Sequence, residues 1–402
     1  MDEFIFSNIV AASSKIAEKA QIEKIRESSA EIVEKISQNN SGLFVIHGLR
    51  GVGKTTILVR LSKITNNSIY LSGDVILKYA VDFLEILNYC DKIGYKLILV
   101  DEVHAIPNWE KDAKIFYDQT TTKLVLTGSS AAALRTRGSE LSRRAMLFEI
   151  RPLSFREYLI FKTGKHIQKV TIEEILNETK RQELSKWVIA YKSDFEEYIS
   201  KHGLPASFFQ NRQDVYMNII ERIVRYDLEI LHSIDIHYID AAFKIIKFIA
   251  TSSPGELSYS GLSSSIGRSI KFTKEAVNIL SLAGLLYIIP PQGAGHKVIR
   301  SEDKILMPLS FRSALCQNYG IKPSEGGLRE DFFIQHVKEA QYIKTGAERR
   351  TPDFAVGNYI FEIGGPSKGW DQLKGKKNAY LVKESLTIEK NEIPLYLFGF
   401  LY

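Results

Sequence analysis

The chain has 402 residues, 45% of them hydrophobic and 25% charged, with a formal net charge of +6. These values are ordinary for a folded protein, and the length predicts two or three domains that need no disulfide staples. The modest positive charge permits nucleic-acid binding without showing it. No apolar run approaches the roughly 18 residues of a membrane span, and the acidic start does not read as a signal peptide. The distant cysteines Cys90 and Cys316 are interpreted as buried thiols, and we expect a cytoplasmic protein.

The first third of the chain predicts a parallel α/β sheet. Apolar residues at helical spacing over 14–38 predict a helix, and helices are also expected from Lys54 and over 82–94 and 112–119. Between them lie very apolar runs, which we read as strands at 43–48, 67–74, 96–102 and 123–130. Strands this apolar, separated by helices, are typical of a parallel sheet covered on both faces.

After Arg151 the pattern changes to helices, which continue to about Ser233. Three further helices follow at 240–250, 258–267 and 273–284, the last with Thr273 as N-cap and Gly284 as C-cap, and then a hairpin at 285–301. Three helices and a hairpin are the winged-helix pattern. The end of the chain predicts a helix (328–341), two strands (352–356 and 359–365), a helix (369–379) and a strand (394–402).

The segment GLRGVGKT, from Gly48 to Thr55, fits the phosphate-binding pattern G-x-x-x-x-G-K-[ST] between a strand and a helix. Glycines let consecutive N–H groups point at a polyphosphate, and the helix N-terminus favours the anion. Lys54 is expected to reach the β- and γ-phosphates, and the Thr55 hydroxyl to bind Mg²⁺. The predicted ligands are therefore ATP and Mg²⁺, with the nucleotide held by Gly48, Leu49, Arg50, Gly51, Val52, Gly53, Lys54, Thr55 and Thr56.

Two later strand ends add candidate catalytic groups. Asp101 follows four apolar residues and can hold the Mg²⁺ through water, while Glu102 can polarise the attacking water. At the tip of the next strand, Thr127 is the predicted polar contact between the two phosphate elements, with Ser129 as the alternate and a simple capped turn as the other interpretation. Arg144 is a candidate arginine finger toward a neighbouring subunit, although a solvated basic loop explains it nearly as well.

With these motifs in place, the chain resembles prokaryotic AAA+ ATPases of the archaeal type, which carry a winged helix and a C-terminal PD-(D/E)XK nuclease-like domain. The likeness rests on GLRGVGKTT, DEVHAIPNWE, LTGSSA, LSRRAMLFEIRPLSFREYL, FEEYISKHGLPA and IIERIVRYDLEIL. In that family a glycine precedes the residue aligned with Arg144, whereas Arg143 stands here, so which arginine acts stays open. The resemblance implies an α/β fold with four parts: a P-loop AAA+ core (1–152), a helical lid (153–235), a winged helix (236–318) and a restriction-endonuclease-like domain (319–402).

In the expected winged helix, Arg268, Lys271 and Lys274 surround the start of the recognition helix, where phosphate and groove contacts normally arise. His296 on the hairpin, with Lys297 and Arg300, is placed to touch the nucleic-acid backbone. Winged helices also dock proteins, so a DNA partner and a protein partner, or a second copy of this chain, both stay open.

The C-terminal domain predicts a second candidate site. Glu330, Asp353 and Glu362 give the carboxylate set of the nuclease-like fold, and two carboxylates from adjacent strand ends can hold Mg²⁺. The usual lysine two residues after the glutamate is replaced by Gly364. Lys368 is able to swing back toward the site, and Gln372 to orient water. Either a migrated lysine leaves a working nuclease, or the domain has lost its chemistry and only binds.

These observations favour an ATP-hydrolysing switch that associates with DNA through its second half. An ATP-gated, metal-dependent DNA endonuclease is the first alternative. A signalling or scaffold ATPase whose C-terminal half binds proteins is the second.

Overall fold

The computed structural model describes residues 1–20, 26–129, 140–201, 203–208, 212–228, 236–253, 258–293, 302–343, 351–385, 389 and 391–402. The chain forms two compact units. The first comprises Met1–Arg151 together with Tyr226–Ser233, and the second comprises Pro152–Arg225 together with Ile234–Tyr402. No helix in the described ranges is both long and apolar enough to cross a membrane.

The first unit is built on a five-stranded, all-parallel sheet with the order β2-β3-β4-β1-β5. The four predicted strands are present, and a fifth that the sequence did not reveal lies at the edge beside β1. This strand order is that of P-loop proteins. The strands are β1 (Leu43–Gly48), β2 (Ser68–Ser72), β3 (Leu97–Asp101), β4 (Lys123–Gly128) and β5 (Ala145–Ile150).

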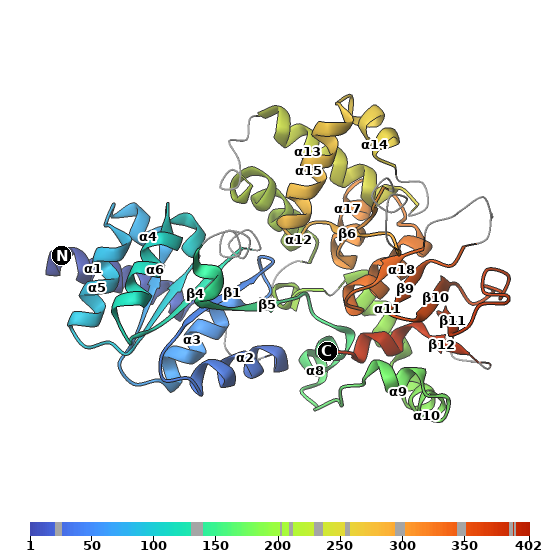
Figure 1. Cartoon of the computed structure of the whole chain (residues 1–402), viewed down its shortest axis with the longest axis horizontal. Helices are drawn as coiled ribbons and strands as arrows, with labels where there is room; N and C mark the ends of the chain where they lie inside the picture. The colour runs from blue at the N-terminus through green and yellow to red at the C-terminus, as the bar shows by residue number, and fades with distance from the viewer. Residues whose placement is uncertain are drawn as a thin grey trace. The chain divides into compact units, whose positions relative to one another are not determined.

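Helices cover both faces of this sheet (Figure 1). Leu43 and Val45 of β1 point into a core shared with α1, α5 and α6, while α3 packs on the other face with α2 behind it. Strands buried on both faces explain why the runs are continuously apolar rather than alternating. The helices are α1 (Glu3–Glu18), α2 (Glu27–Ser37), α3 (Lys54–Ile64), α4 (Gly73–Lys78), α5 (Phe83–Lys92) and α6 (Trp109–Gln119).

The position of β4 matters for the site. It lies between β1 and β3, so its carboxyl end, at Thr127, stands between the end of the P-loop strand and the end of the strand that carries Asp101. In an open parallel sheet, ligands bind at the carboxyl ends of the strands.

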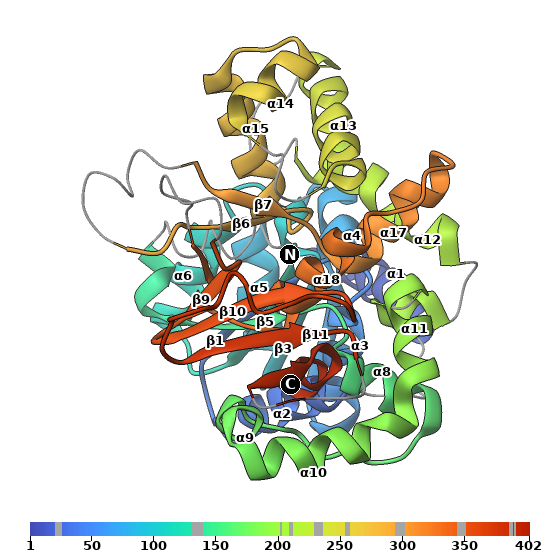
Figure 2. The same ribbon diagram turned by 90° about the vertical axis from the view of Figure 1, so that its right-hand side faces the viewer.

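The second unit combines helices with a mixed sheet of order β12-β11-β10-β9-β8. In this sheet β8, β9 and β10 are antiparallel neighbours, whereas β10, β11 and β12 run parallel. Figure 2 shows β9, β10 and β11 of this sheet. The helix that precedes it, α18 (Glu325–His336), packs on β10. The strands are β8 (Gln341–Tyr342), β9 (Phe354–Val356), β10 (Tyr359–Gly364), β11 (Ala379–Lys383) and β12 (Glu392–Pro394).

The segment expected as a separate lid, 153–235, does not stand apart from this sheet. Phe155 and Tyr198 share one core with Phe332 of α18 and with Phe400 near the C-terminus. The expected boundary at 235 lies close to Ser233, where the segment Tyr226–Ser233 of the first unit ends, whereas the one at 318 falls inside the second unit. Its first helices are α8 (Phe155–Thr163), α9 (Ile172–Leu176), α10 (Glu178–Val188), α11 (Lys192–Lys201) and α12 (Arg212–Arg222).

Three helices and a two-stranded antiparallel ladder follow within this unit, in the order that the sequence predicts. The N-cap of the third helix is Ser269, whose side chain accepts the Phe272 N–H, and not Thr273, which is buried one turn later. The elements are α13 (Ile236–Thr251), α14 (Tyr259–Ile266), α15 (Ile270–Leu282), β6 (Tyr287–Ile289) and β7 (Lys304–Leu306), followed by α17 (Leu309–Asn318).

Two predicted elements near the C-terminus differ in the structure. Residues 369–379 form turns rather than a helix, and the final apolar run forms a 3₁₀ helix, Leu395–Phe400, rather than a strand. Gly369 and Gly375 lower the helix propensity of this stretch. The buried residues Leu395–Phe400 pack against α18 and α8, so they contribute to the hydrophobic core without joining the sheet.

A fully buried ion pair joins α17 to α18. Arg312 pairs with Asp331 through Nε, and its Nη2 lies 3.2 Å from Asp331 Oδ1. Arg312 Nη1 also donates to the carbonyls of Ile249 (2.7 Å) and Ala250 (3.0 Å) at the end of α13. Asp331 accepts the Met307 N–H at 3.1 Å. Neither side chain is exposed, so this network ties three helices and the end of β7 together away from water.

Candidate functional site

The loop between β1 and α3 has the conformation of a phosphate cradle. Gly51 and Gly53 have φ values of 82° and 100°, in the left-handed region that glycine adopts without strain. A Cβ on Gly48 would lie 2.2 Å from the Ile150 carbonyl oxygen, so no larger residue fits beside β5. The loop ends at the N-terminus of α3, whose free N–H groups favour an anion.

A buried arginine that the sequence did not reveal holds this loop. Arg26, at the start of α2, donates from Nη1 to the carbonyls of Val52 (3.1 Å) and Arg151 (2.7 Å). Hydrogen bonds from a charged donor are stronger than neutral ones. The cradle is thus fixed from behind by α2 and by the end of β5.

Lys54 lies over its own loop. Its Nζ donates to the carbonyls of Gly48 and Leu49, both at 3.0 Å, and its side chain is buried. Burial lowers the pKa of Lys54, against the opposing effect of Glu102 and Asp101. An ammonium held only by two carbonyls in a buried cradle is well placed to turn to phosphate oxygens, which offer it a full negative charge.

Asp101 accepts hydrogen bonds from three hydroxyl groups, which come from two strands and one helix. It accepts from Thr55 Oγ1 (2.7 Å), from Tyr70 OH (2.8 Å) and from Thr127 Oγ1. Burial and the neighbouring Glu102 raise the pKa of Asp101, and the three hydroxyl donors oppose that shift. The Thr55 hydroxyl and the Asp101 carboxylate thus lie side by side, an all-oxygen pair that suits Mg²⁺ bound together with phosphate oxygens and water. Tyr70 is a further member of this site that the sequence did not reveal.

Glu102 is held in an unusual backbone conformation, with φ 53° and ψ 42°. Its N–H donates to Thr127 Oγ1 at 3.2 Å, and its carboxylate lies 3.4 Å from Arg50 Nη1. His104 Nδ1 lies 3.3 Å from Glu102 Oε2. Burial lowers the pKa of His104, which favours the neutral ring. The carboxylate is therefore positioned by contacts from the P-loop and from the turn after β3.

The structure brings most of the predicted nucleotide residues together, but it places Arg144 elsewhere on this unit. Arg144 Nε pairs with Asp118 Oδ1 of α6 at 2.7 Å, and the pairing raises the pKa of Arg144. Arg143 ends a short 3₁₀ turn just before it. The alternate Ser129 donates its N–H toward His104 Nδ1 at 3.4 Å and so lies behind Glu102.

The second unit gathers the three predicted nuclease-like carboxylates around two lysines. Lys368 Nζ pairs with Glu362 Oε1, and Lys304 Nζ pairs with Glu330 Oε2. Asp353 Oδ2 accepts the Ile363 N–H at 2.8 Å. Burial raises the pKa of Glu330 to about 7 although Lys304 opposes the shift, and it raises the pKa of Glu362 to about 7 although Lys368 and Lys304 oppose it. Lys304, which comes from β7, is a member that the sequence did not reveal.

Lys368 occupies the side-chain position that Gly364 leaves open. A Cβ on Gly364 would lie 2.3 Å from Lys368 Cγ and 2.4 Å from its Cβ. The lysine stem thus fills the space next to the strand where a side chain at 364 would project, and its ammonium reaches Glu362 from there. Gln372, by contrast, lies in a turn and donates to the Thr351 carbonyl at 2.9 Å.

These carboxylates do not form a ready metal site. Among the described residues, no three Asp, Glu, His or Cys side chains converge closely enough to hold a metal ion. The Glu362 Oε2 atom is nevertheless buried without a hydrogen-bond partner in the described structure. As it stands, the cluster is an ion-pair network in which ammonium groups neutralise the carboxylates.

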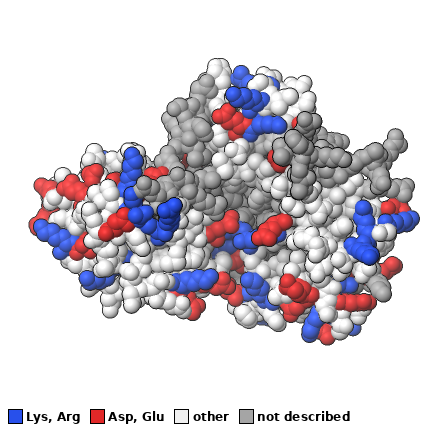
Figure 3. Space-filling model, viewed as in Figure 1, with Lys and Arg blue, Asp and Glu red and all other residues white. Residues whose placement is uncertain are grey.

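The cations expected to contact DNA are exposed around the start of α15. Arg268 lies over the Phe272 ring at 5.7 Å and Lys274 over the Tyr259 ring at 5.0 Å, while Lys271 is exposed between them. The hairpin residues His296, Lys297 and Arg300 lie outside the described residues. On the face shown in Figure 3, basic and acidic side chains are interspersed over the described part, without one dominant basic tract.

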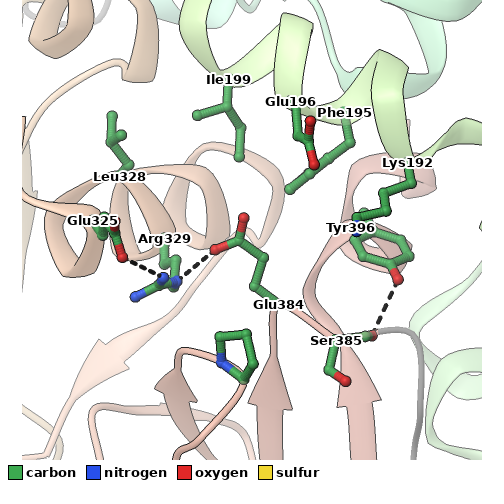
Figure 4. A pocket seen from close by; sticks show the side chains of 11 residues that line it. Lys192, Phe195, Glu196, Ile199, Glu325, Leu328, Arg329, Glu384, Ser385 and Tyr396 are labelled. Atoms are coloured by element: carbon green, nitrogen blue, oxygen red, sulfur yellow. Dashed lines mark hydrogen bonds and ion pairs between the residues drawn. The ribbon is translucent and has the colours of Figure 1, made fainter.

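A cavity of about 590 Å³ lies between α11 and α18 of the second unit. In Figure 4 Arg329 pairs with Glu384 (2.7 Å) and Glu325 (3.1 Å), while no dashed line joins Lys192 or Glu196 to the other residues drawn. The Tyr396 hydroxyl donates to the Ser385 carbonyl at 3.1 Å.

Comparison with known proteins identifies the first unit. Residues 40–159 match the family model described as an AAA domain, a stretch that contains the whole P-loop, Asp101, Glu102 and Thr127. The chain carries an AAA domain. Such domains are P-loop ATPases, and Lys54 and Asp101 both lie within the matched residues.

Two uncharacterized proteins of one archaeon are similar to parts of this chain. It is 29% identical over 326 residues to the uncharacterized protein MJ1637 of Methanocaldococcus jannaschii, covering 75% of this chain and 69% of that protein. It is 28% identical over 189 residues to the uncharacterized protein MJ1544 of the same organism, covering 44% of this chain and 41% of that one. The alignment to MJ1637 is 326 residues long and therefore extends beyond residues 40–159, which match the AAA domain.

Among solved structures, a chain from a study of DNA unwinding at forked double-stranded DNA by two coordinating Pif1 helicases matches 40% of this chain and 51% of its own length. The sequence identity is 14% and the TM-score 0.23. A score this low supports no inference about the fold or partners of this protein.

Proposed function

We propose that the protein is a nucleotide-driven switch: an ATPase whose AAA domain binds and hydrolyses Mg²⁺–ATP. One observation carries the proposal. Thr55, Asp101 and Thr127 are joined by hydrogen bonds beside a glycine cradle that holds Lys54, so the phosphate-binding and metal-binding groups already share one network. Lys54 and Thr55 come from α3, Asp101 from β3 and Thr127 from β4, and each has the chemistry that its position requires.

In this scheme the loop N–H groups bind the phosphates, and Lys54 leaves its two carbonyls for the β- and γ-phosphate oxygens. Mg²⁺, when bound, neutralises charge on those oxygens. Thr55 and Asp101 orient the metal side of the site, while Glu102 accepts hydrogen bonds from the attacking water and polarises it. Thr127 donates a hydrogen bond to Asp101 and accepts one from the Glu102 N–H, so it fixes the positions of these two residues relative to each other. Loss of the γ-phosphate then releases the contacts that order this region.

Replacing Lys54 tests the binding half of this proposal. We expect Lys54→Ala to weaken ATP binding at least about tenfold, because a charge-assisted bond to phosphate is worth roughly 1.5–3 kcal/mol. Titration calorimetry with Mg²⁺–ATP measures it. Lys63→Ala, an exposed lysine of the same helix, is the matched control and should bind like wild type. Equal affinity of wild type and Lys54→Ala would contradict the proposed site.

For the second half of the chain, we propose DNA association through a winged-helix-like part. Its support is the order of α13, α14, α15 and the β6–β7 ladder, and the exposed cations Arg268, Lys271 and Lys274 at the start of α15. Phosphate contacts from such cations make binding weaken steeply with salt. A gel shift at two ionic strengths tests it; no retention at low salt would instead favour a protein partner or a second copy of the chain.

A second candidate function is a metal-dependent DNA endonuclease in the C-terminal sheet, which resembles the PD-(D/E)XK fold. The observation that favours it is Lys368, whose stem fills the place of a side chain at Gly364 and brings an ammonium to Glu362. A metal would have to displace one of the two lysines from its carboxylate, since no three-ligand site is formed among the described residues. The candidate thus depends on whether these ion pairs open.

Plasmid cleavage distinguishes a working nuclease from a binding domain. If the candidate is right, wild type nicks supercoiled plasmid with Mg²⁺ or Mn²⁺ but not with a chelator, and Asp353→Asn and Lys368→Ala lower the rate at least about tenfold. Lys374→Ala, an exposed lysine in the same segment, should cleave like wild type. Cleavage by Asp353→Asn at the wild-type rate would assign the nicking to a contaminant.

A further inference from the structure

One residue in the ATP site comes from far along the chain. Asp227 belongs to the short segment Tyr226–Ser233 that joins the first unit, beyond the residues that match the AAA domain. Its carboxylate is buried, with only 8% of the side chain exposed, and its Oδ1 atom lies 3.8 Å from Arg50 Nη2. Arg50 is a variable position of the P-loop pattern, so neither residue is marked by the motif itself.

Arg50 stands between two acidic groups. Its Nη1 lies 3.4 Å from Glu102 Oε1 and its Nη2 faces Asp227, while its buried Nε has no hydrogen-bond partner among the described residues. Both ion-pair distances are longer than the 2.7–2.9 Å of a tight charge-assisted bond. Arg50 is therefore attracted to both carboxylates but locked to neither, and it keeps an unused donor.

The other charges around this arginine favour movement when nucleotide arrives. Lys54 is the other basic group of the site, and Asp101, Glu102 and Asp227 are its acidic groups; burial raises the pKa of Asp227 and lowers that of His104, which also faces Glu102. Without nucleotide the acids outnumber the cations, so Arg50 is held by them. A γ-phosphate placed beside Glu102 adds a concentrated negative charge within reach of the same guanidinium, whose planar fork suits phosphate oxygens.

We propose that Arg50 senses the γ-phosphate, and that Asp227 and Glu102 compete with the nucleotide for it. In the nucleotide-free state Arg50 bridges the two carboxylates and restrains Glu102. ATP draws Arg50 onto its γ-phosphate, which frees the Glu102 carboxylate to face the attacking water. ADP has no γ-phosphate, so Arg50 stays with the acids. Asp227 acts only through Arg50 and is a positioning residue. The inference rests on the proposed ATPase function and deepens it.

Competition predicts opposite effects for the two residues. Arg50→Ala removes a phosphate contact, so ATP should bind about tenfold more weakly or worse, with ADP changed by less than about twofold. Asp227→Asn removes a competitor, so ATP should bind about two- to fivefold more tightly, the range of a partly exposed ion pair, with ADP again unchanged. A residue that merely supports the fold would weaken both nucleotides together.

The experiment is a titration of the full chain with fluorescent ATP and ADP analogues in the presence of Mg²⁺, alongside steady-state hydrolysis. Glu31→Gln, an exposed acid on α2, is the control for charge alone and should match wild type. Asp227→Glu keeps the charge and should show the wild-type ratio of ATP to ADP affinity. This variant also tests the role of the charge if Asp227→Asn folds poorly.

The outcomes separate this inference from the function beneath it. Weaker ATP binding by Asp227→Asn, or equal losses of ATP and ADP in Arg50→Ala, would overturn the sensing role while wild type still hydrolyses ATP. Failure of wild type to bind ATP at all would instead remove the proposed function.

Discussion

Glu102→Gln is expected to bind Mg²⁺–ATP at least as tightly as wild type and to hydrolyse it about 10²–10⁴-fold more slowly, the usual contribution of a positioned general base. Glutamine keeps the size of the side chain and its contacts to Arg50 and His104, but its amide oxygen is a much weaker base than a carboxylate. Single-turnover phosphate release measures the hydrolytic step, and calorimetry measures the binding.

Two comparisons keep this result specific. Glu31→Gln makes the same chemical change at an exposed position and should hydrolyse ATP at the wild-type rate. Lys54→Ala fails at an earlier step, so its activity should recover in part at high ATP concentration, whereas that of Glu102→Gln should not. Normal turnover by Glu102→Gln would show that another group activates the water, and the scheme for the strand ends would have to be abandoned.

The nucleotide site was largely predictable because its parts are local in the sequence. Gly48–Thr55 must lie in one loop, and Asp101 must follow its strand directly, so spacing alone places them. Thr127 needed one more step, the expectation that β4 lies between the other two strands. Arg26 and Tyr70 could not be found this way, since a lone arginine or tyrosine carries no pattern until the fold brings it to the loop or to Asp101.

Asp227 and Lys304 illustrate the same limit over longer distances. Asp227 follows Arg50 by 177 positions along the chain (227 minus 50), and only the return of one short segment places it near the P-loop. Lys304 reaches Glu330 from a three-residue strand that has no sequence pattern of its own. Lys368 was predictable, because Gly364 raised the question of which lysine takes its place and one lay four residues away.

The predicted elements that differ fail for an identifiable reason. The sequence predicts no strand for residues 145–150, yet they form β5, which pairs with β1 in parallel register. The last apolar run reads as a strand, yet its residues pack as a 3₁₀ helix into a core that already contains α8 and α18. In both places tertiary packing overrides local preference, as is common for short segments.

Asp331→Ala is expected to be the most destabilising single change in the second unit, at about 3–5 kcal/mol. The substitution leaves the Arg312 guanidinium without its counter-ion at a position where neither side chain is exposed. The three helices and the end of β7 that meet at this pair then lose a shared anchor, although the carbonyls of Ile249 and Ala250 still accept from Arg312.

Urea unfolding followed by the emission of Trp187 and Trp370, which lie in this unit, measures the loss, with Trp109 reporting on the AAA domain. Asp371→Ala, which removes an exposed acid paired with Lys374, should stay within about 0.5 kcal/mol of wild type. If Asp331→Ala proved as mild as Asp371→Ala, the buried pair would not be what holds α17 to α18, and apolar packing between those helices would have to account for the stability of the unit.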